Sequence, residues 1–580
     1  MKKLLVYLKD YTKESVLGPL FKLLEACFEL FVPLVIAAMI DRGIGGADKP
    51  FLVRMTLLLV VLGVVGLVCS LTAQYYAAKA AAGFAKKLKH ALFAHIQRLS
   101  FAELDAAGTS TMITRMTSDA NQVQTGVNLV LRLMLRSPFV VFGAMIMAFT
   151  IDVKAALVFA VAIPVLSVVV FGIMLWCIPL YKKVQTHLDG VLGMTRENLS
   201  GARVLRAFCK EEEQAQTFGV RNDTLTRVQN TVGRISALMN PVTFVLINAA
   251  VIWLIWTGAL RVEAGLITQG AVVALYNYMS QILVELIKLA SLIITTTKAV
   301  ASGNRIQDIF ALRASVLSPD HMPVLPEGCP AVEFRHAVLR YRGAAEPALC
   351  DIHFPVQPGE TVGIIGGTGS GKSSLVHLLP RFYDVCEGEV LVNGADVREY
   401  PLHALRARIG LVPQKAVLFK GSIRDNLRWG NGDATDDELF MALTAAQAAD
   451  VVAGKGGLDA QIEQGGKNLS GGQRQRLTIA RALVRRPDIL ILDDSASALD
   501  LATDAALRKA LRALSYRPTV FIVSQRAASV LYADRIIVLD DGAVAGMGKS
   551  DELLKTCEVY REIFQSQFGK EAVLHAVAKD

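Results

Sequence analysis

Long apolar stretches alternate with charged segments over the first half of the chain. A helix needs roughly 20 apolar residues to cross a hydrocarbon layer of about 30 Å. Six stretches meet this requirement, at about residues 16–40, 55–78, 129–150, 155–178, 241–261 and 268–298. The pattern predicts a membrane bundle of six helices, with short connections after the first, third and fifth and long connections after the second and fourth.

The two long connections are rich in Lys and Arg. Because basic connections are retained on the cytoplasmic side, both of them and both chain ends are predicted to be cytoplasmic. Helical patterns at 84–99 and 184–199 indicate that the membrane helices continue beyond the bilayer and return through a short turn. The amino-terminal sequence MKKLLVYLKDY is typical of an interfacial amphipathic helix rather than a cleaved signal.

The second half of the chain has a different pattern. Residues 315–330 contain four prolines and one glycine, which indicates a linker. Beyond it, short β-rich runs alternate with helical patterns, at 361–365, 389–394, 488–493 and 519–524. This alternation predicts an α/β domain with a largely parallel sheet. The predicted organisation is a transmembrane domain at 1–315, a linker at 316–330 and a soluble domain at 331–580.

Composition agrees with a membrane protein. Of the 580 residues, 53% are hydrophobic, and the mean hydropathy is +0.41, which is too apolar for an ordinary soluble chain. The net charge of +9 is explained by basic cytoplasmic connections, so no nucleic-acid partner is predicted. The eight cysteines have neither a CxxC pair nor metal-ligand spacing, so neither a disulfide framework nor a zinc site is indicated.

The clearest chemical motif is a phosphate-binding loop. Residues 366–373 read Gly-Gly-Thr-Gly-Ser-Gly-Lys-Ser and fit G-x-x-x-x-G-K-[ST] between an apolar strand and a helix. Backbone N–H groups and the helix end attract phosphate, Lys372 reaches the terminal phosphates, and Ser373 is a ligand for Mg²⁺. The apolar strand at 489–492 carries Asp493 to the same Mg²⁺. The predicted phosphate-binding residues are Gly366, Thr368, Gly369, Ser370, Gly371, Lys372, Ser373 and Ser374.

A second glycine-rich motif lies between these two. It consists of Leu469, Ser470, Gly471, Gly472 and Gln473, followed by a helical pattern. With this motif the chain resembles the ATP-binding cassette (ABC) superfamily, in which LSGGQ is the signature that binds the γ-phosphate of ATP held by the opposite cassette. The resemblance further implies that Tyr341 stacks on adenine and that Gln414 senses Mg²⁺. It also implies that residues 497–500 touch the opposite site.

The resemblance covers essentially the whole chain. Residues 99–119 and 197–208 look like the two intracellular loops of an exporter-type (type IV) membrane domain, whose ends carry short coupling helices that dock on the cassettes. The chain is most similar to the bacterial heterodimeric multidrug exporters. This implies a multi-pass protein of the inner (plasma) membrane with a cytoplasmic cassette, driven by ATP and Mg²⁺.

Two positions depart from the family pattern. Active cassettes have Glu after the Asp of this strand, whereas this chain has Asp494, whose carboxylate is one methylene shorter. The family has His in the switch loop, whereas this chain has Gln525, which cannot become cationic or carry a proton. Because the signature is intact, we expect a heterodimer with a homologous half-transporter. This chain's own site would then bind ATP and hydrolyse it slowly.

Ionisable residues within or near the predicted membrane helices offer two interpretations. They are Glu25, Glu29, Arg132, Arg136, Glu285 and Lys288. Charges in hydrocarbon are costly, so these side chains either contact an amphipathic substrate or pair between helices and reach towards the membrane edge. The predicted function is export of hydrophobic or amphipathic small molecules. The alternatives are a dedicated lipid or peptide exporter, an importer built on the exporter fold, and a regulatory ATP-binding subunit.

Overall fold

The computed structural model describes residues 2–569 and divides the chain into two compact units. The first, which we call the helical unit, contains residues up to Gln97 and Ser110–Ala311. The second, the α/β unit, combines Arg98–Thr109 with the chain from Leu312 onwards. A short segment from the first half of the sequence therefore folds with the second half.

The helical unit confirms the prediction of six membrane helices. Within the described residues, six helical segments are long and apolar enough to cross a membrane, and each has 42 to 53 residues. They therefore extend well beyond the roughly 20 residues that a bilayer requires. The segments are Lys3–Ile44, Lys49–Arg98, Thr109–Ile151, Val153–Ser200, Glu211–Glu263 and Gln269–Ala311.

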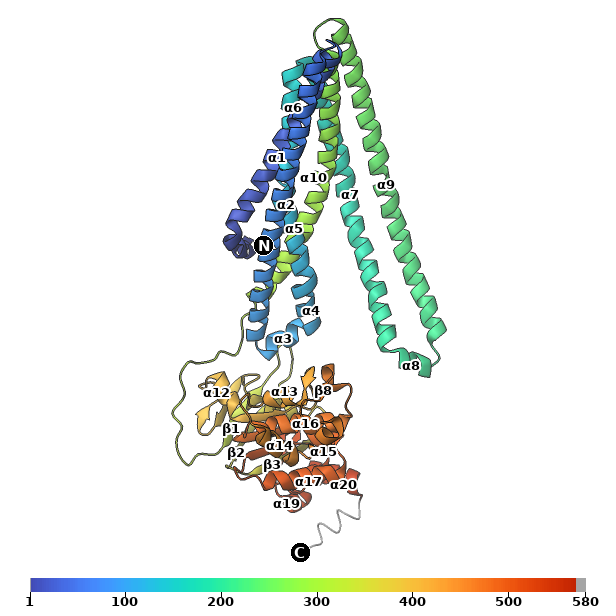
Figure 1. Cartoon of the computed structure of the whole chain (residues 1–580). Helices are drawn as coiled ribbons and strands as arrows, with labels where there is room; N and C mark the ends of the chain where they lie inside the picture. Colours follow the sequence, from blue (N-terminus) through green and yellow to red (C-terminus); the bar gives the residue numbers. More distant parts are fainter. Residues whose placement is uncertain (1, 570–580) are drawn as a thin grey trace. The chain divides into compact units, whose positions relative to one another are not determined.

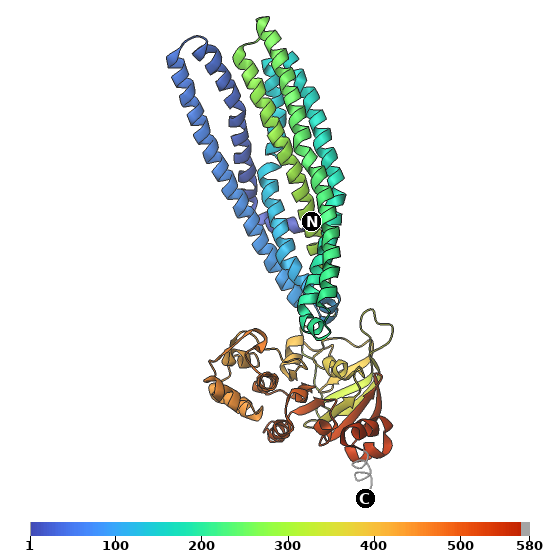
Figure 2. The same ribbon diagram turned by 90° about the vertical axis from the view of Figure 1, so that its right-hand side faces the viewer.

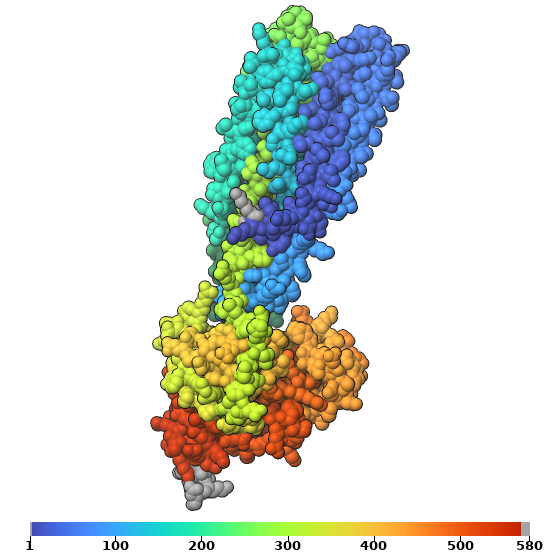
Figure 3. Space-filling view, turned by 90° about the vertical axis from the view of Figure 1, so that its left-hand side faces the viewer, coloured from blue at the N-terminus to red at the C-terminus, as the bar shows by residue number. Residues whose placement is uncertain are grey.

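Several of these segments are divided into shorter elements. The elements in chain order are η1 (Lys2–Tyr11), α1 (Thr12–Ala38), η2 (Met39–Ile44), α2 (Lys49–Arg98), α4 (Thr109–Thr114), η3 (Arg115–Asp119), α5 (Ala120–Leu133), α6 (Arg136–Ile151), α7 (Val153–Ser200), α8 (Ala202–Ala207), α9 (Glu211–Glu263) and α10 (Gln269–Ala311). The segment η1, coloured dark blue in Figure 3, lies beside the final part of α10, with the rings of Tyr7 and Phe310 6.3 Å apart.

The helices pack in two groups that also contact each other. Helix α10 contacts α1, α5 and α6, and α7 packs along α9, while α10 and α6 join the groups through contacts with α9 and α7. Figure 1 shows α7 and α9 leaving the other helices towards the end where α8 joins them, and Figure 2 shows the same hairpin in green. The core between the groups contains the fully buried Phe159, Leu254 and Tyr278, and the Tyr278 hydroxyl donates to the carbonyl of Leu30 at 2.6 Å. The most apolar window of Lys49–Arg98 has no buried residue, as expected for a helix that faces lipid.

The charged residues in the middle of the helical unit pair with one another. Arg136 on α6 donates to Glu285 on α10 and, at 2.6 Å, to Glu29 on α1. Glu285 also accepts from Ser137 and from Lys288, each at 2.8 Å. We call Glu29, Arg136, Glu285 and Lys288 the interhelical charge cluster; Arg136 and Glu285 are buried, whereas Glu29 and Lys288 are partly exposed. It joins three helices, as the pairing alternative predicts. Glu29, Glu285 and Lys288 also line a cavity of about 300 Å³, so contact with a substrate stays a prediction.

The α/β unit contains a short helix, α3 (Phe101–Ala107), and two main sheets. Its strands are β1 (Val332–Leu339), β2 (Leu349–Val356), β3 (Thr361–Gly366), β4 (Glu387–Val392), β5 (Ala395–Asp396), β6 (Ile409–Val412), β7 (Gly421–Ser422), β8 (Gln461–Ile462), β9 (Ile489–Asp493), β10 (Thr519–Val523), β11 (Arg535–Asp540) and β12 (Ala543–Gly548). The larger sheet has the order β12-β11-β3-β10-β9-β6, and only β12 in it runs antiparallel.

The predicted strand at 389–394 does not join this sheet. It forms β4 in a separate antiparallel sheet of order β2-β1-β4-β5. The expectation of one largely parallel sheet is therefore right for the three other predicted strands and wrong for this one. Which strands pair with each other depends on contacts between residues distant in sequence, such as Val332 opposite Val392. A local run of apolar residues does not encode such contacts.

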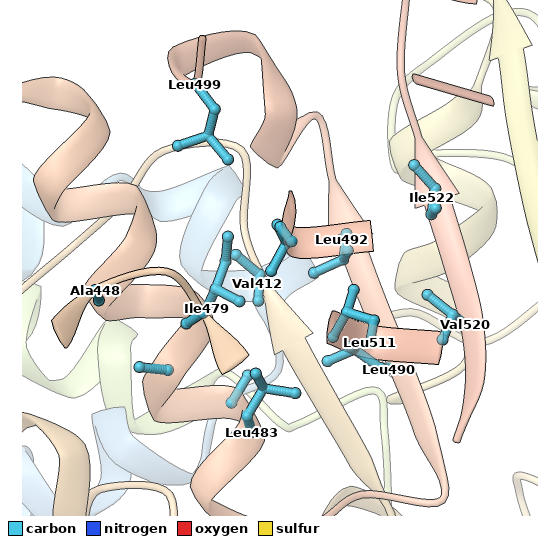
Figure 4. Close-up of a cluster of buried hydrophobic side chains, with 14 of the residues drawn as sticks. Val412, Ala448, Ile479, Leu483, Leu490, Leu492, Leu499, Leu511, Val520 and Ile522 are labelled. Atoms are coloured by element: carbon cyan, nitrogen blue, oxygen red, sulfur yellow. The ribbon is translucent and has the colours of Figure 1, made fainter. Parts of the chain in front are cut away.

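One face of the larger sheet packs mainly against helices, and the other packs against helices and the smaller sheet. The remaining helices of this unit follow α3 in chain order. They are α11 (Lys372–Leu378), α12 (Leu402–Ala407), α13 (Ile423–Arg428), α14 (Asp436–Ala445), α15 (Ala449–Lys455), η4 (Gln464–Gly466), α16 (Gly471–Val484), η5 (Ser495–Ala498), α17 (Leu501–Arg512), α18 (Ala527–Val530), α19 (Ser550–Thr556) and α20 (Glu558–Phe568). Strand β9 is buried along its whole length, which explains its continuous apolar sequence. Figure 4 shows the core where side chains of β6, β9 and β10 meet those of α16 and α17, among them Val412, Leu490, Leu492, Ile522, Ile479, Leu483 and Leu511.

Candidate nucleotide site

The phosphate loop connects the end of β3 to the start of α11. Three glycines are required by its backbone. A Cβ on Gly366 would lie 2.1 Å from the carbonyl oxygen of Leu539, and Gly369 and Gly371 have φ of +87° and +92°, a conformation that L side chains rarely adopt. The loop is therefore held close to the sheet, with α11 beginning directly after it.

Lys372 is the buried cation of this loop. Its side chain is 8% exposed, and its Nζ donates to the carbonyl oxygens of Gly366 at 3.0 Å and Gly367 at 2.5 Å. Burial lowers the pKa of the Lys372 ammonium, and the carboxylates of Asp493 and Asp494 oppose that shift. A cation in this position is suited to neutralise phosphate charge.

The structure brings Ser373 and Asp493 together at the edge of β9. The Ser373 hydroxyl donates to Asp493 Oδ1 at 2.9 Å, and His377 Nε2 lies 3.6 Å from Asp493 Oδ2. Burial raises the pKa of Asp493, while the hydrogen bond from Ser373 lowers it. A hydroxyl and a carboxylate side by side supply the hard oxygen ligands that Mg²⁺ prefers, so these residues fit the ion.

His377 was not selected from the sequence, although a local signal was available. It lies four residues after Ser373 on α11, and positions i and i+4 share one face of a helix. Burial lowers the pKa of His377, so its neutral form is favoured beside Asp493.

The two departures from the family pattern lie around the same loop. Asp494 has a φ of +45° directly after β9, and its Oδ2 accepts from Gln414 Nε2 at 3.3 Å. Gln525 follows β10, and its Oε1 accepts from the Thr368 hydroxyl at 3.5 Å. Four residues selected from the sequence therefore meet in two contacts at the end of the central strands.

Tyr341 also lies beside the loop. Its hydroxyl is 2.8 Å from the hydroxyl of Ser374, and its ring meets that of Tyr383 edge to face at 5.1 Å. An aromatic ring held in this way, next to the first turn of α11, offers a stacking surface to a flat ligand.

The signature residues lie elsewhere in the unit, at the start of α16. The Ser470 hydroxyl accepts from the Gln473 backbone N–H at 3.3 Å, and the Gln473 side chain accepts from the Ser470 N–H at 3.0 Å, which forms a capping box. A Cβ on Gly472 would lie 3.1 Å from the carbonyl oxygen of Ala498, so the signature adjoins η5. No hydrogen bond in residues 2–569 joins the signature residues to the phosphate loop.

Helix α3 contacts the rest of the α/β unit through aromatic rings. The rings of Phe101 and Phe382 are 4.4 Å apart, and the Tyr383 hydroxyl donates to Asp105 Oδ2 at 2.6 Å. Burial and the Asp105 carboxylate raise the pKa of Tyr383. The sequence predicted a coupling helix near residue 101. It did not indicate that this helix packs against Phe382 and Tyr383.

Six long apolar helices joined to an α/β unit with a phosphate loop define an ATP-driven membrane transporter. A family model described as the ABC transporter transmembrane region matches residues 15–286, and one described as ABC transporter matches residues 349–497. The uncharacterized ABC transporter ATP-binding protein Rv1273c of Mycobacterium tuberculosis is 37% identical over 567 residues, or 97% of each chain. The chain belongs to the ABC transporter family and is an exporter-type half-transporter with an ATPase domain.

Two further relatives have functional names. An ATP-dependent lipid A-core flippase of Desulfotalea psychrophila is 31% identical over 479 residues, which cover 82% of this chain and 83% of that protein. YgaD of Bacillus subtilis, provisionally named a multidrug export ATP-binding/permease protein, is 28% identical and covers 98% of this chain and 99% of its own.

A solved structure has the same fold. It is the structure of a bacterial Atm1-family ABC exporter with ATP bound. The match covers 96% of this chain and 98% of that chain, with a TM-score of 0.80 and 23% sequence identity. The fold predicted from the sequence, a six-helix membrane bundle with an α/β cassette, is thereby confirmed.

Proposed function

We propose that this chain is one half of a heterodimeric exporter of amphipathic small molecules and that its own nucleotide site hydrolyses ATP slowly. Family membership supports ATP-driven export, and the provisional name of YgaD favours multidrug substrates. In the proposed orientation, the cassette and both chain ends lie on the cytoplasmic side of the inner membrane. The working domains are residues 1–315 and 331–580, with the linker at 316–330 between them.

Within the site, each residue receives a role from its position. Lys372 and the loop N–H groups bind the β- and γ-phosphates, and Tyr341 stacks on adenine. Ser373, Asp493 and Gln414 surround Mg²⁺, which offsets phosphate charge when it is bound. The contacts of Ser373 with Asp493 and of Gln414 with Asp494 support this arrangement.

Slow hydrolysis is supported mainly by the chemistry of two side chains at the loop. Asp494 is one methylene shorter than the Glu that orients the attacking water in active cassettes. A loss of about 1 Å in reach costs on the order of a hundredfold in a step that depends on positioning. Gln525 faces Thr368, but an amide cannot take up a proton or carry positive charge.

The separation of the signature from the phosphate loop supports a dimer of cassettes, and the two altered positions, Asp494 and Gln525, favour an unlike partner. Because the capped start of α16 is intact, Ser470 and Gly472 are available to a γ-phosphate held by another cassette. A partner with Glu and His at the two altered positions would supply the rapid site. The exposed apolar side chains around α8, Val204 and Phe208, are available for docking on that partner's cassette.

The test is the ATPase activity of the chain purified alone in lipid nanodiscs. We expect weak activity, little changed by Asp494→Asn, and a rise of about a hundredfold in the double variant Asp494→Glu with Gln525→His. Asp351→Glu is a matched control, because Asp351 also has a left-handed backbone, with a φ of 48°, and lies outside the site. Rapid hydrolysis that survives Asp494→Asn would refute the asymmetric model.

A lipid exporter is the second candidate, and the similarity to a lipid A-core flippase favours it. The two functions are separated by the compounds that stimulate the ATPase of the complete dimer. Stimulation by cationic and neutral dyes supports multidrug export, whereas stimulation by lipids alone supports the lipid exporter.

A further inference from the structure

A cavity of about 620 Å³ lies in the α/β unit between α17, β10 and residues 529–534. None of the phosphate-loop or signature residues lines it. Its walls include Thr361 at the start of β3 and Val520 and Ile522 on β10, so it opens at the opposite end of these strands from the phosphate loop. The cavity is therefore separate from the nucleotide site.

The ionisable groups that line this cavity are mostly cationic. Four are basic, namely Arg508, Lys509, Arg512 and Arg517, and one is acidic, Asp534. The Asp534 carboxylate already accepts from the backbone N–H of Thr361 at 2.8 Å, which fixes it against the sheet. The excess of positive charge favours an anionic ligand.

Two of the basic side chains are held in place. Arg508 donates to the carbonyl oxygens of Asp504 at 3.3 Å and Ala528 at 3.0 Å and lies 3.1 Å from the Asp504 carboxylate. Arg512 donates to the carbonyl oxygen of Tyr532. These contacts orient two guanidinium groups on neighbouring turns of α17, so little side-chain entropy is lost on binding.

The other two basic side chains are exposed and have no partner in the part of the chain that the structure describes. They are Lys509 and Arg517, both of which line the cavity. Tyr532 also lines the cavity and is 64% exposed, with the Arg508 guanidinium carbon 5.7 Å from its ring centroid. The cavity thus combines fixed guanidinium groups, free cations and an accessible aromatic surface.

We propose that this cavity binds the phosphate groups of a small polyanionic ligand. Guanidinium groups match phosphate oxygens in paired hydrogen bonds, and ammonium groups add charge without a fixed geometry. The ligand is either a compound with phosphate groups alone or a nucleotide whose base stacks on Tyr532. The shared chemistry is phosphate recognition by Arg508, Lys509, Arg512 and Arg517.

The position of the cavity suggests how a bound ligand could affect ATP hydrolysis. Helix α17 begins after Asp500, in the loop that the family resemblance places at the opposite site, and α18 begins two residues after Gln525. Arg508 connects the two helices through Ala528, and Arg526 connects the two loops by donating to the carbonyl oxygen of Ser497 at 3.1 Å. An occupant of the cavity would act on both helices and would regulate the nucleotide site.

The binding test uses labelled pyrophosphate and the full chain in nanodiscs, measured by equilibrium dialysis. All proteins carry Lys372→Ala, so that the phosphate loop contributes little. We expect saturable binding of one pyrophosphate per chain, weakened about tenfold by Lys509→Gln with Arg517→Gln. The control variant Lys415→Gln with Lys549→Gln removes two exposed lysines outside the cavity and should bind normally. Absence of saturable binding, or equal affinity in both charge-reduced variants, would overturn the proposal.

Competition by ADP against labelled pyrophosphate identifies the kind of ligand, because ADP bound elsewhere is not counted. If Tyr532→Leu weakens ADP competition and leaves pyrophosphate binding unchanged, the ligand is a nucleotide. If ADP competes equally in both proteins, the ligand is a phosphate compound without a stacked ring.

Discussion

Replacing Phe101 by Ala removes the aromatic side chain through which α3 packs on the rest of the α/β unit. The Phe101 ring lies 4.4 Å from Phe382 and 6.4 Å from Tyr383. The neighbouring hydrogen bond from Tyr383 to Asp105 is left in place, so the variant measures the apolar part of the contact alone. We expect α3 to detach more often and transport to lose its connection to ATP hydrolysis.

The size of the effect follows from the buried area. Phe101 is 40% exposed, so about 120 Å² of a phenylalanine surface of roughly 200 Å² is covered. At about 25 cal/mol per Å², the loss is at most about 3 kcal/mol. This corresponds to an increase of roughly a hundredfold in the population of detached α3.

Hydrogen exchange of the peptide that contains residues 101–107 measures this population directly, since exchange reports local opening. The exchange rate of that peptide should rise by roughly a hundredfold in Phe101→Ala if opening limits protection. In proteoliposomes, the same variant of the complete dimer should retain ATP hydrolysis but transport less dye for each ATP consumed.

Phe440→Ala is the matched control, because Phe440 is a phenylalanine of the cassette with a similar exposure of 46% and lies on α14. Its effect on the exchange of residues 101–107 should be negligible. The reasoning fails if α3 exchanges at the wild-type rate in Phe101→Ala, or if the control accelerates exchange equally.

Three further perturbations test other parts of the molecule. Arg136→Met leaves Glu29 without the guanidinium that it contacts and Glu285 with Lys288 alone, so it should destabilise the helical unit, by less than the roughly 3–5 kcal/mol expected when a fully buried charge loses every partner. Neutralising both carboxylates as well should restore the apparent Tm in detergent, and a lack of recovery would contradict the pairing. Gly366→Ala forces its new methyl group against the carbonyl of Leu539 and should weaken binding of a fluorescent ATP analogue by about tenfold or more, whereas unchanged affinity would show that the loop adapts. Burial and Asp105 raise the pKa of Tyr383 above its ordinary value of 10.0, so its contribution to stability is fully present below that pH and is lost as the pH rises through the folded pKa. Ultraviolet titration against Tyr383→Phe should show one phenol that ionises later than the others, and its absence would refute the shift.

Features encoded by neighbouring residues could be predicted from the sequence. Apolar length is enough to locate a membrane helix, and the spacing from Gly366 to Ser373 is enough to locate a phosphate loop, because each depends on residues that are close in the chain. The charge pairs could not be predicted. Arg136 is 107 residues from Glu29 and 149 from Glu285, and only the packing of three helices decides that they meet.

The contact of α3 shows the same limit. Asp105 and Tyr383 are 278 residues apart, and each taken alone has the sequence context of an ordinary surface residue. His377 is an intermediate case, because its distance of four residues from Ser373 places both on one face of α11. Local periodicity could therefore have identified it, whereas no local pattern identifies Tyr383.

The length of α9 has a mechanical consequence. A helix of 53 residues is about 80 Å long, and α7, with 48 residues, runs beside it. If this hairpin pivots as a stiff rod, a rotation of roughly 10° about one end displaces the other end by about 14 Å. Such a lever arm converts a small angular change at one end into a large displacement at the other, at reduced force. Stiffness along α7 and α9 therefore sets how much of an angular change reaches the far end.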